Sequence, residues 1–199
     1  MSSLWPKSSP TVWREALDSY SAVVAKQGVT RLPELDAWYR DELSSTIEKR
    51  HPRHVTLAEL VKLTEWKMAR GVWRAPNLIL VKGNDAESVK KTTTAALASA
   101  PHPTAPVAAL AKLDGVGPAT ASALAAAAEP NVYPFLDELV AAQVPGLGAV
   151  KWTMAYYAKY AEALRERART LGEEWTPVMV EQALWASVGG KAGVRAKAR

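Results

Sequence analysis

The chain has 199 residues, of which 48% are hydrophobic and 23% are charged, and its formal net charge is +5. These values are typical of a folded protein with one domain or two small lobes, and they exclude a disordered chain or a fibrous repeat. The absence of cysteine excludes disulfides, thiolate zinc sites, cysteine nucleophiles and cysteine-bound iron–sulfur clusters. The N-terminus lacks the pattern of a signal peptide and no apolar run approaches membrane-spanning length, so we expect an intracellular protein without a membrane partner.

Helical patterns dominate the first half of the chain. Apolar residues recur at helical spacing over 11–27 and 33–50, and Thr56 is placed to cap a third helix. A short apolar segment over 77–81 precedes a further helical pattern over 85–100. The first hundred residues therefore predict four helices and no strand.

The second half of the chain begins with a proline-rich linker and is also helical. We expect helices over 105–113, 118–128, a short stretch after Pro134, 149–171 and 177–187. The sequence therefore predicts an all-α, compact multi-helix fold. Residues 1–190 are expected to form a single helical domain, or two lobes of one, and residues 191–199 a basic flexible tail.

The turn between the helices expected over 105–113 and 118–128 carries the most specific signal. Gly115 and Gly117 allow positive φ angles and close backbone approach, and Pro118 suits the first turn of a helix. Such a turn presents backbone amides at a helix start, where a phosphate binds favourably. A dinucleotide-binding fold would need a preceding strand and a third glycine, both of which the sequence lacks.

Residues 107–145 resemble the helix-hairpin-helix and the following segment of the endonuclease III-type DNA glycosylase superfamily. The stretch LDGVGPATA resembles the hairpin of that family, and YPFLDELV resembles the segment that bears its catalytic aspartate. Asp137 follows Gly115 by 22 positions, as in endonuclease III-like members, and the order Pro-Phe-Leu-Asp is most similar to the monofunctional adenine glycosylase branch. The resemblance implies base excision in DNA repair, without an iron–sulfur cluster or another cofactor.

The resemblance also implies roles for individual residues. Asp137 would be the catalytic carboxylate, which stabilises the positive charge that develops at C1′ of a flipped nucleotide as its base leaves. Bifunctional members carry a lysine at the position of Ala119, so the resemblance implies hydrolysis by water without lyase activity. The residues implied to hold the nucleic acid at the hairpin are Gly115, Val116, Gly117, Ala119 and Thr120.

A basic and aromatic segment, TEWKMARGVWR over 64–74, is the second candidate for nucleic-acid binding. Residues 51–100 carry a net charge of +4, whereas 113–150 contain no lysine or arginine, so the hairpin would need this segment to hold a polyanion. We expect phosphate contacts from Lys67, Arg70 and Arg74, and a pocket facing Asp137 lined by Trp66, Tyr133 and Trp152. The alternative is that the tryptophans belong to the core and the cations to a solvated face.

Two roles remain open at the level of single residues. Asp137 is also suited to be an ordinary acid at a helix start, and Glu138 is then the second candidate for the carboxylate. Lys67 could supply an amine from another helix, although a solvated surface lysine is its more ordinary role.

The sequence thus predicts a protein that resembles a monofunctional DNA glycosylase. We expect a monomer that binds duplex DNA with a damaged or mispaired base, in the nucleus if the organism is a eukaryote. The first alternative is a non-catalytic helix-hairpin-helix module that binds nucleic acid or a protein, and the second is a purely structural helical bundle. His51, His54 and His102 lack ligand spacing, so we expect no metal site.

Overall fold

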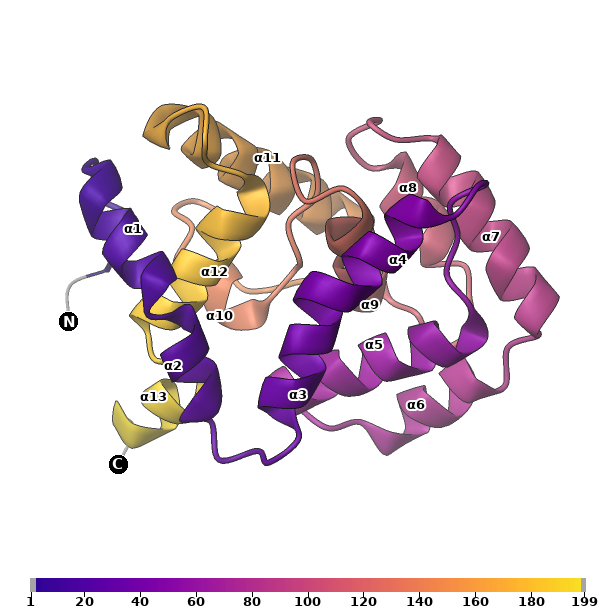
Figure 1. Cartoon of the computed structure of the whole chain (residues 1–199). Coiled ribbons are helices and arrows are strands. Elements are labelled where there is room, and N and C mark those ends of the chain that lie inside the picture. The colour runs from indigo at the N-terminus through magenta and orange to yellow at the C-terminus, as the bar shows by residue number, and fades with distance from the viewer. Residues whose placement is uncertain (1–2, 198–199) are drawn as a thin grey trace.

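The computed structural model describes residues 3–197, and the side chains of residues 3–195. Every regular element in this range is a helix, which confirms the predicted all-α class (Figure 1). The elements are α1 (Pro10–Asp18), α2 (Tyr20–Ala25), α3 (Leu32–Ala37), η1 (Trp38–Leu43), α4 (Ser44–Lys49), α5 (Leu57–Arg70), α6 (Ala75–Lys82), α7 (Ala86–Ala98), α8 (Ala105–Leu110), α9 (Pro118–Ala128), α10 (Glu138–Ala141), α11 (Met154–Leu171), α12 (Pro177–Ser187) and α13 (Gly190–Lys197).

Local side-chain chemistry explains where several helices begin. At α5, the Thr56 hydroxyl accepts a hydrogen bond from the Glu59 amide at 3.3 Å, and the Glu59 carboxylate accepts one from the Thr56 amide at 2.8 Å. Asp85, Thr153 and Thr176 cap α7, α11 and α12 in the same manner, each through one side-chain oxygen. These caps satisfy amides that a helix start leaves without a partner, so short sequence motifs determine these boundaries.

Two predicted helices are divided in the structure. The segment expected as one helix over 11–27 forms α1 and α2, with a break at Ser19, whose hydroxyl donates to the Ala16 carbonyl at 2.7 Å. The segment over 33–50 remains helical, but Trp38–Leu43 adopts the wider π-helical hydrogen bonding of η1. The spacing of apolar residues does not predict the break or the π-helical segment, because the same side chains face the core in spite of these two changes.

Two helices form where the sequence indicates none. The apolar segment over 77–81 lies within α6, which starts with Pro76 in its first turn and buries Leu78 and Val81. The predicted basic tail over 191–199 is helical as α13 up to Lys197, and its last two residues lie outside the described range.

Helix α13 is held by distant contacts. The Gln27 side chain donates to the Gly189 carbonyl at 3.1 Å and accepts from the Ala192 amide at 3.0 Å. The Lys191 ammonium pairs with Glu138 at the start of α10 at 2.9 Å. A segment whose order depends on such contacts cannot be distinguished from a flexible end by its own composition.

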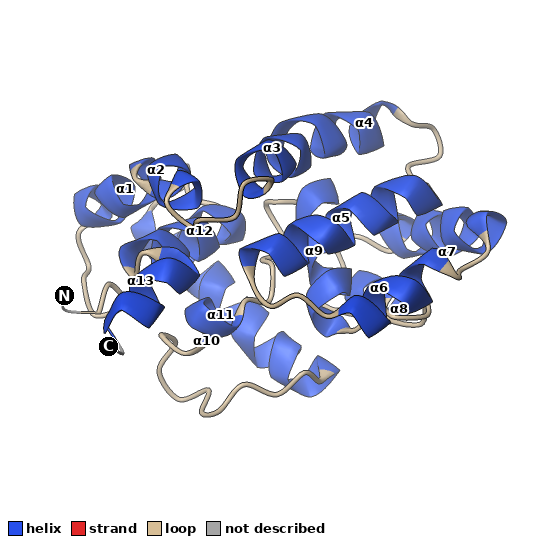
Figure 2. Ribbon diagram, turned by 90° about the horizontal axis from the view of Figure 1, so that it is seen from below, coloured by secondary structure: helices blue, strands red, loops and turns tan. Residues whose placement is uncertain are grey.

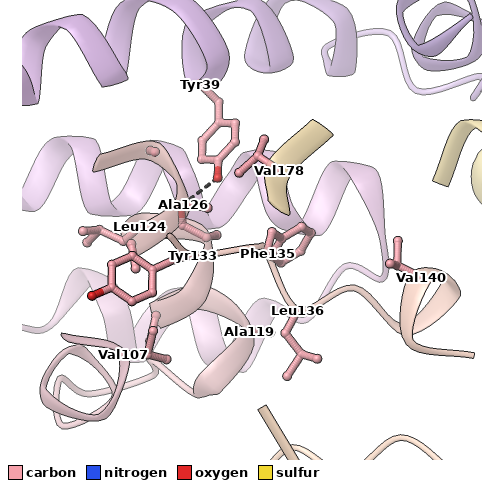
Figure 3. Close-up of a cluster of buried hydrophobic side chains, with 14 of the residues drawn as sticks. Tyr39, Val107, Ala119, Leu124, Ala126, Tyr133, Phe135, Leu136, Val140 and Val178 are labelled. Atoms are coloured by element: carbon pink, nitrogen blue, oxygen red, sulfur yellow. Dashed lines mark hydrogen bonds between the residues drawn. The ribbon is translucent and has the colours of Figure 1, made fainter. Parts of the chain in front are cut away.

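Helix α9 is the most buried element of the molecule. Its alanines leave room for close approach, and it packs against α4, α5, α8 and η1. Figures 1 and 2 show α1, α2, α12 and α13 on one side of the molecule and α5 to α8 on the other. In Figure 3, Tyr39 of η1 reaches over α9, and its hydroxyl donates to the Ala123 carbonyl at 2.7 Å. Trp66 of α5 stacks on Tyr39 with ring centroids 3.6 Å apart, so aromatic rings join α5, η1 and α9.

A buried polar network links the two sides. Arg70 of α5 forms an ion pair with Glu181 of α12, and both side chains are inaccessible to solvent. Arg40 of η1 approaches the second oxygen of Glu181 at 3.6 Å. Asp36 accepts from the Tyr20 hydroxyl and the Trp66 indole, each at 2.8 Å. Burial raises the pKa of Glu181, and the two arginines oppose this effect, so the network depends on its own pairing for charge compensation.

Candidate nucleic-acid interface

The turn between α8 and α9 is clamped against α6. Gly115 has φ +72°, and a Cβ atom at this position would lie 2.6 Å from the Asn77 carbonyl oxygen and 2.8 Å from the Val81 nitrogen. The Asn84 side chain donates to the Asp114 carbonyl at 2.9 Å and accepts from the Asp114 amide at 3.0 Å. The backbone angle and the close approach both require glycine at 115, so this residue positions the hairpin on α6.

The start of α9 presents backbone amides without an internal partner. Gly117 is the N-cap and provides no side chain, and Pro118 in the first turn has no N–H group. Among the described residues, no oxygen accepts a hydrogen bond from the amides of Gly117, Ala119 or Thr120. Val116 is buried and anchors the turn instead of facing solvent. An anion at this point would be favoured by the amides and by the helix dipole.

Two adjoining hollows lie between this helix start and Asp137. The first, which we call the hairpin hollow, has a volume of about 310 Å³ and is lined by Lys67, Arg74, Asn77, Gly117, Pro118, Ala119, Thr120 and Trp152. The second, the aspartate hollow, has a volume of about 50 Å³ and is lined by Lys67, Gly71, Val72, Arg74, Phe135, Asp137, Glu138 and Trp152. Because Lys67, Arg74 and Trp152 belong to both, the hollows form one depression with two cations and an aromatic ring at its middle.

Asp137 is both a helix cap and a wall of the aspartate hollow. One of its carboxylate oxygens, Oδ1, accepts from the Leu139 amide at 2.8 Å and the Val140 amide at 3.4 Å, which fixes the side chain at the start of α10. The other oxygen, Oδ2, lies 3.8 Å from Nε of Arg70. Asp137 is 7% exposed, so its carboxylate is an oriented, largely desolvated negative charge at the edge of a small space.

Lys67 lines both hollows, and its pKa is lower than that of an ordinary lysine. Burial lowers the pKa of Lys67, and the neighbouring charge of Arg74 lowers it further, while Glu138 and Asp137 oppose the shift. The amine is therefore easier to deprotonate than that of an ordinary surface lysine. Arg74 is exposed at the rim, where it is available to an anionic ligand.

Five predicted site residues line neither hollow. Two of them, Gly115 and Val116, lie in the turn itself, where Gly115 packs against α6 and Val116 is buried. Arg70 is buried in the ion pair with Glu181, because its position on α5 faces the core, so it cannot contact a ligand at the surface. Trp66 is fully buried in the stack with Tyr39, which agrees with the alternative prediction that this tryptophan belongs to the core. Tyr133 is also fully buried, and its hydroxyl donates to the His102 carbonyl at 2.8 Å.

The remaining predicted residues are brought together. Trp152, 47% exposed, lines both hollows from the loop before α11. Sequence reasoning missed Asn77 and Phe135 as wall residues. Phe135 lies two positions before Asp137 in the segment already singled out, so alternation along an extended loop could have found it, whereas Asn77 gave no such signal.

Within the described range, no three histidine, aspartate or glutamate side chains gather closely enough to hold a metal ion. None of the described helices combines the length and apolar character needed to cross a bilayer. Comparisons of the chain with protein-family models, curated proteins and solved structures find no match.

Proposed function

We propose that the protein binds nucleic acid across the hairpin hollow and removes a base there, with Asp137 as the carboxylate that stabilises the departing state. One observation supports this proposal most directly. Asp137 and the unpartnered amides of α9 lie on the same depression, and Lys67 and Arg74 line both of its hollows.

The hairpin hollow suits a phosphate of a nucleic-acid backbone. The amides of Ala119 and Thr120 provide donors in fixed positions, and the guanidinium of Arg74 supplies charge that the hairpin itself lacks. Trp152 offers a half-exposed ring on which an unpaired base can stack. Phosphate binding and base stacking within one depression are what a flipped nucleotide requires.

In this proposal, Asp137 acts by electrostatic stabilisation. As the glycosidic bond breaks, positive charge develops at C1′, and a fixed carboxylate nearby stabilises it without reorganising. The α10 amides hold Oδ1, whereas Oδ2 accepts no hydrogen bond from the described residues. The aspartate hollow, with a volume of about 50 Å³, has room for a water molecule, which needs roughly 10–15 Å³ by this measure. In the proposed reaction, the bond between C1′ and the base nitrogen breaks and its electron pair stays on the base. The oxygen of one such water bonds to C1′, and the proton that this water loses ends on the base nitrogen, so that the neutral base leaves into the larger hollow.

Base release from a panel of duplexes tests this function. The duplexes carry uracil, hypoxanthine, alkylated adenine or an oxidised-guanine mispair, and alkali is added afterwards to cleave the abasic sites. Asp137→Asn is the decisive variant, because asparagine caps a helix as well as aspartate does, so that the change removes the negative charge, with its ion pair to Arg70, and keeps the cap. We expect wild type to produce alkali-dependent breaks and Asp137→Asn to lose them.

The matched control is Asp85→Asn. Asp85 caps α7 through the Ser88 amide at 2.8 Å and lies on neither hollow, so this variant makes the same chemical change at a cap away from the site. Equal base release by wild type and Asp137→Asn would exclude Asp137 as the catalytic carboxylate.

The second candidate function is a non-catalytic helix-hairpin-helix module. It is favoured by the small volume beside Asp137 and by the capping bonds, which already account for an aspartate at this position. Salt-sensitive binding to the same duplexes without base release from any of them would support this module over the glycosylase.

A further inference from the structure

Large apolar side chains are exposed mainly on one part of the molecule. Most of those in the described range lie on the loop between α5 and α6, on α6 itself or in the loop before α11. We call this set the apolar row, and its members are Val72, Trp73, Ile79, Leu80 and Trp152. The remaining ones are valines that are far apart in the chain, Val12, Val29 and Val194. Exposed apolar side chains that gather in this way are typical of a binding surface.

The apolar row borders both hollows. Val72 and Trp152 line the aspartate hollow, and Trp152 also lines the hairpin hollow. Trp73 is the next residue after Val72 in the same loop. Leu80 of α6 lies beside the hairpin turn, since its Cβ atom is 2.9 Å from the position of a Cβ atom at Gly115. The row therefore reaches the aspartate hollow and the hairpin turn.

The charged side chains on the same stretch of chain are all positive. Residues 66–84 contain no aspartate or glutamate. Arg74 and Lys82 are exposed, and Lys67 lines both hollows. The start of α9 adds backbone amides that have no partner among the described residues. An apolar surface interrupted by cations and fixed donors is complementary to a polyanion that also presents flat apolar faces.

An unpaired strand of nucleic acid presents both features, whereas a duplex does not. In a duplex the faces of the bases are stacked on one another, and the outside shows phosphates, sugars and the edges of the bases. In a single strand each base has a free face that can stack on an aromatic ring. Trp73 is 55% exposed and Trp152 is 47% exposed, so both rings are accessible to such faces.

We propose that the apolar row binds unpaired nucleotides, so that the depression takes single-stranded nucleic acid in preference to a duplex. Bases stack on Trp73 and Trp152, and phosphates contact Arg74, Lys82 and the amides of α9. This inference rests on the proposed function for nucleic-acid binding at the hairpin hollow, and it adds the form of strand that the site accepts.

Competition between strand forms tests the proposal. The probes are a labelled oligothymidylate, an oligouridylate of the same length and a duplex of the same length, and fluorescence anisotropy measures their affinities for the full chain. We expect a single-stranded probe to bind about tenfold or more tightly than the duplex. A preference for either single strand over the duplex supports the inference, and the stronger of the two identifies the sugar.

Matched variants separate stacking from charge. Trp73→Leu and Trp152→Leu keep an apolar side chain but lack the ring, so each should weaken single-strand binding about fivefold or more. The dependence of log affinity on log salt concentration should stay unchanged, because no cation is lost. Trp73→Phe keeps a ring and should retain most of the affinity. Both tryptophans are exposed, so thermal unfolding of these variants should match that of wild type.

Val29→Ala is the control for these variants. Val29 is an exposed apolar side chain that lines neither hollow, so its truncation should leave single-strand binding unchanged.

The outcomes distinguish this inference from the proposed function. Duplex binding as tight as single-strand binding, or full single-strand affinity in both leucine variants, overturns the inference even if bases are released from duplexes. A wild-type dimer in sedimentation that Trp73→Leu dissociates overturns it in favour of a second copy of this chain. Single-strand binding that depends on both tryptophans supports the inference even when no base is released, and the failure then belongs to the proposed glycosylase alone.

Discussion

Two cations of α5, one helical turn apart, have opposite environments. Arg70 is fully buried and paired with Glu181 of α12, whereas Lys67 opens onto two hollows and pairs with no described carboxylate. The spacing along the helix is the same that predicted a common basic face. The difference arises because α12 supplies a buried carboxylate opposite Arg70, whereas Lys67 faces two hollows lined by loop residues, by Asn77 of α6 and by the starts of α9 and α10. A row of cations therefore divides into structural and ligand-facing members according to what packs against it.

The largest loss of stability is expected from removing Glu181, the buried partner of Arg70. Glu181→Ala leaves Arg70 and Arg40 buried without their shared carboxylate, which should lower the free energy of unfolding by about 3–5 kcal/mol. Denaturant unfolding measures this loss. The control is Glu162→Gln, which removes the ion pairs of the exposed Glu162 with Arg165 and Arg169 and should cost less than about 1 kcal/mol. Equal effects of the two variants would show that the buried network does not join α5 to α12.

The next largest loss of stability concerns Gly115, which packs the hairpin turn against α6 beside the hairpin hollow. Gly115→Ser places a side chain at φ +72° against the Asn77 carbonyl and should lower the free energy of unfolding by about 2–4 kcal/mol. Gly117→Ser is the matched variant, because that N-cap has an ordinary φ of −89° and nothing within 4 Å of a Cβ atom. It should change stability by no more than about 0.5 kcal/mol. Thermal unfolding of both variants measures the contrast, which a similar loss at 117 would contradict.

A smaller effect, on the binding of DNA, is expected from removing a cation that lines the two hollows. Arg74→Gln removes a cation from the rim of both hollows and should reduce the dependence of log affinity on log salt concentration by about 1. Fluorescence anisotropy with a labelled duplex at several salt concentrations measures the slope. Lys90→Gln, on α7 and away from both hollows, should leave the slope unchanged. If the slope falls only in Lys90→Gln, the interface lies on α7.

The smallest effect concerns the pH dependence at Lys67. Because the pKa of Lys67 is lower in the folded protein than in the unfolded chain, the unfolded chain binds more protons between these two pKa values. Wild-type stability should therefore rise with pH through that interval. Lys67→Met lacks this dependence, so it should be slightly more stable than wild type at neutral pH and lose the difference near pH 10.5, the ordinary value. Denaturant unfolding of both proteins from pH 7 to 10.5 checks this, and a constant difference would contradict it.

The sequence by itself determined the helical class and several helix boundaries. Thr56 and Pro177 mark starts that the structure reproduces, because caps and first-turn prolines act within a few residues. Gly115 was recognised as a turn residue for the same local reason. Its close contact with α6 could not be predicted, because α6 itself gave no helical signal.

Only the tertiary structure decided which polar residues share a surface. It buried Arg70, Trp66 and Tyr133, and it placed Lys67 and Trp152 on the depression with Asp137. These outcomes depend on partners distant in the chain, such as Asp36 for Trp66, 30 residues away, and Glu181 for Arg70, 111 residues away. Helical periodicity reports which face a residue occupies, but burial and charge pairing depend on the element packed against that face.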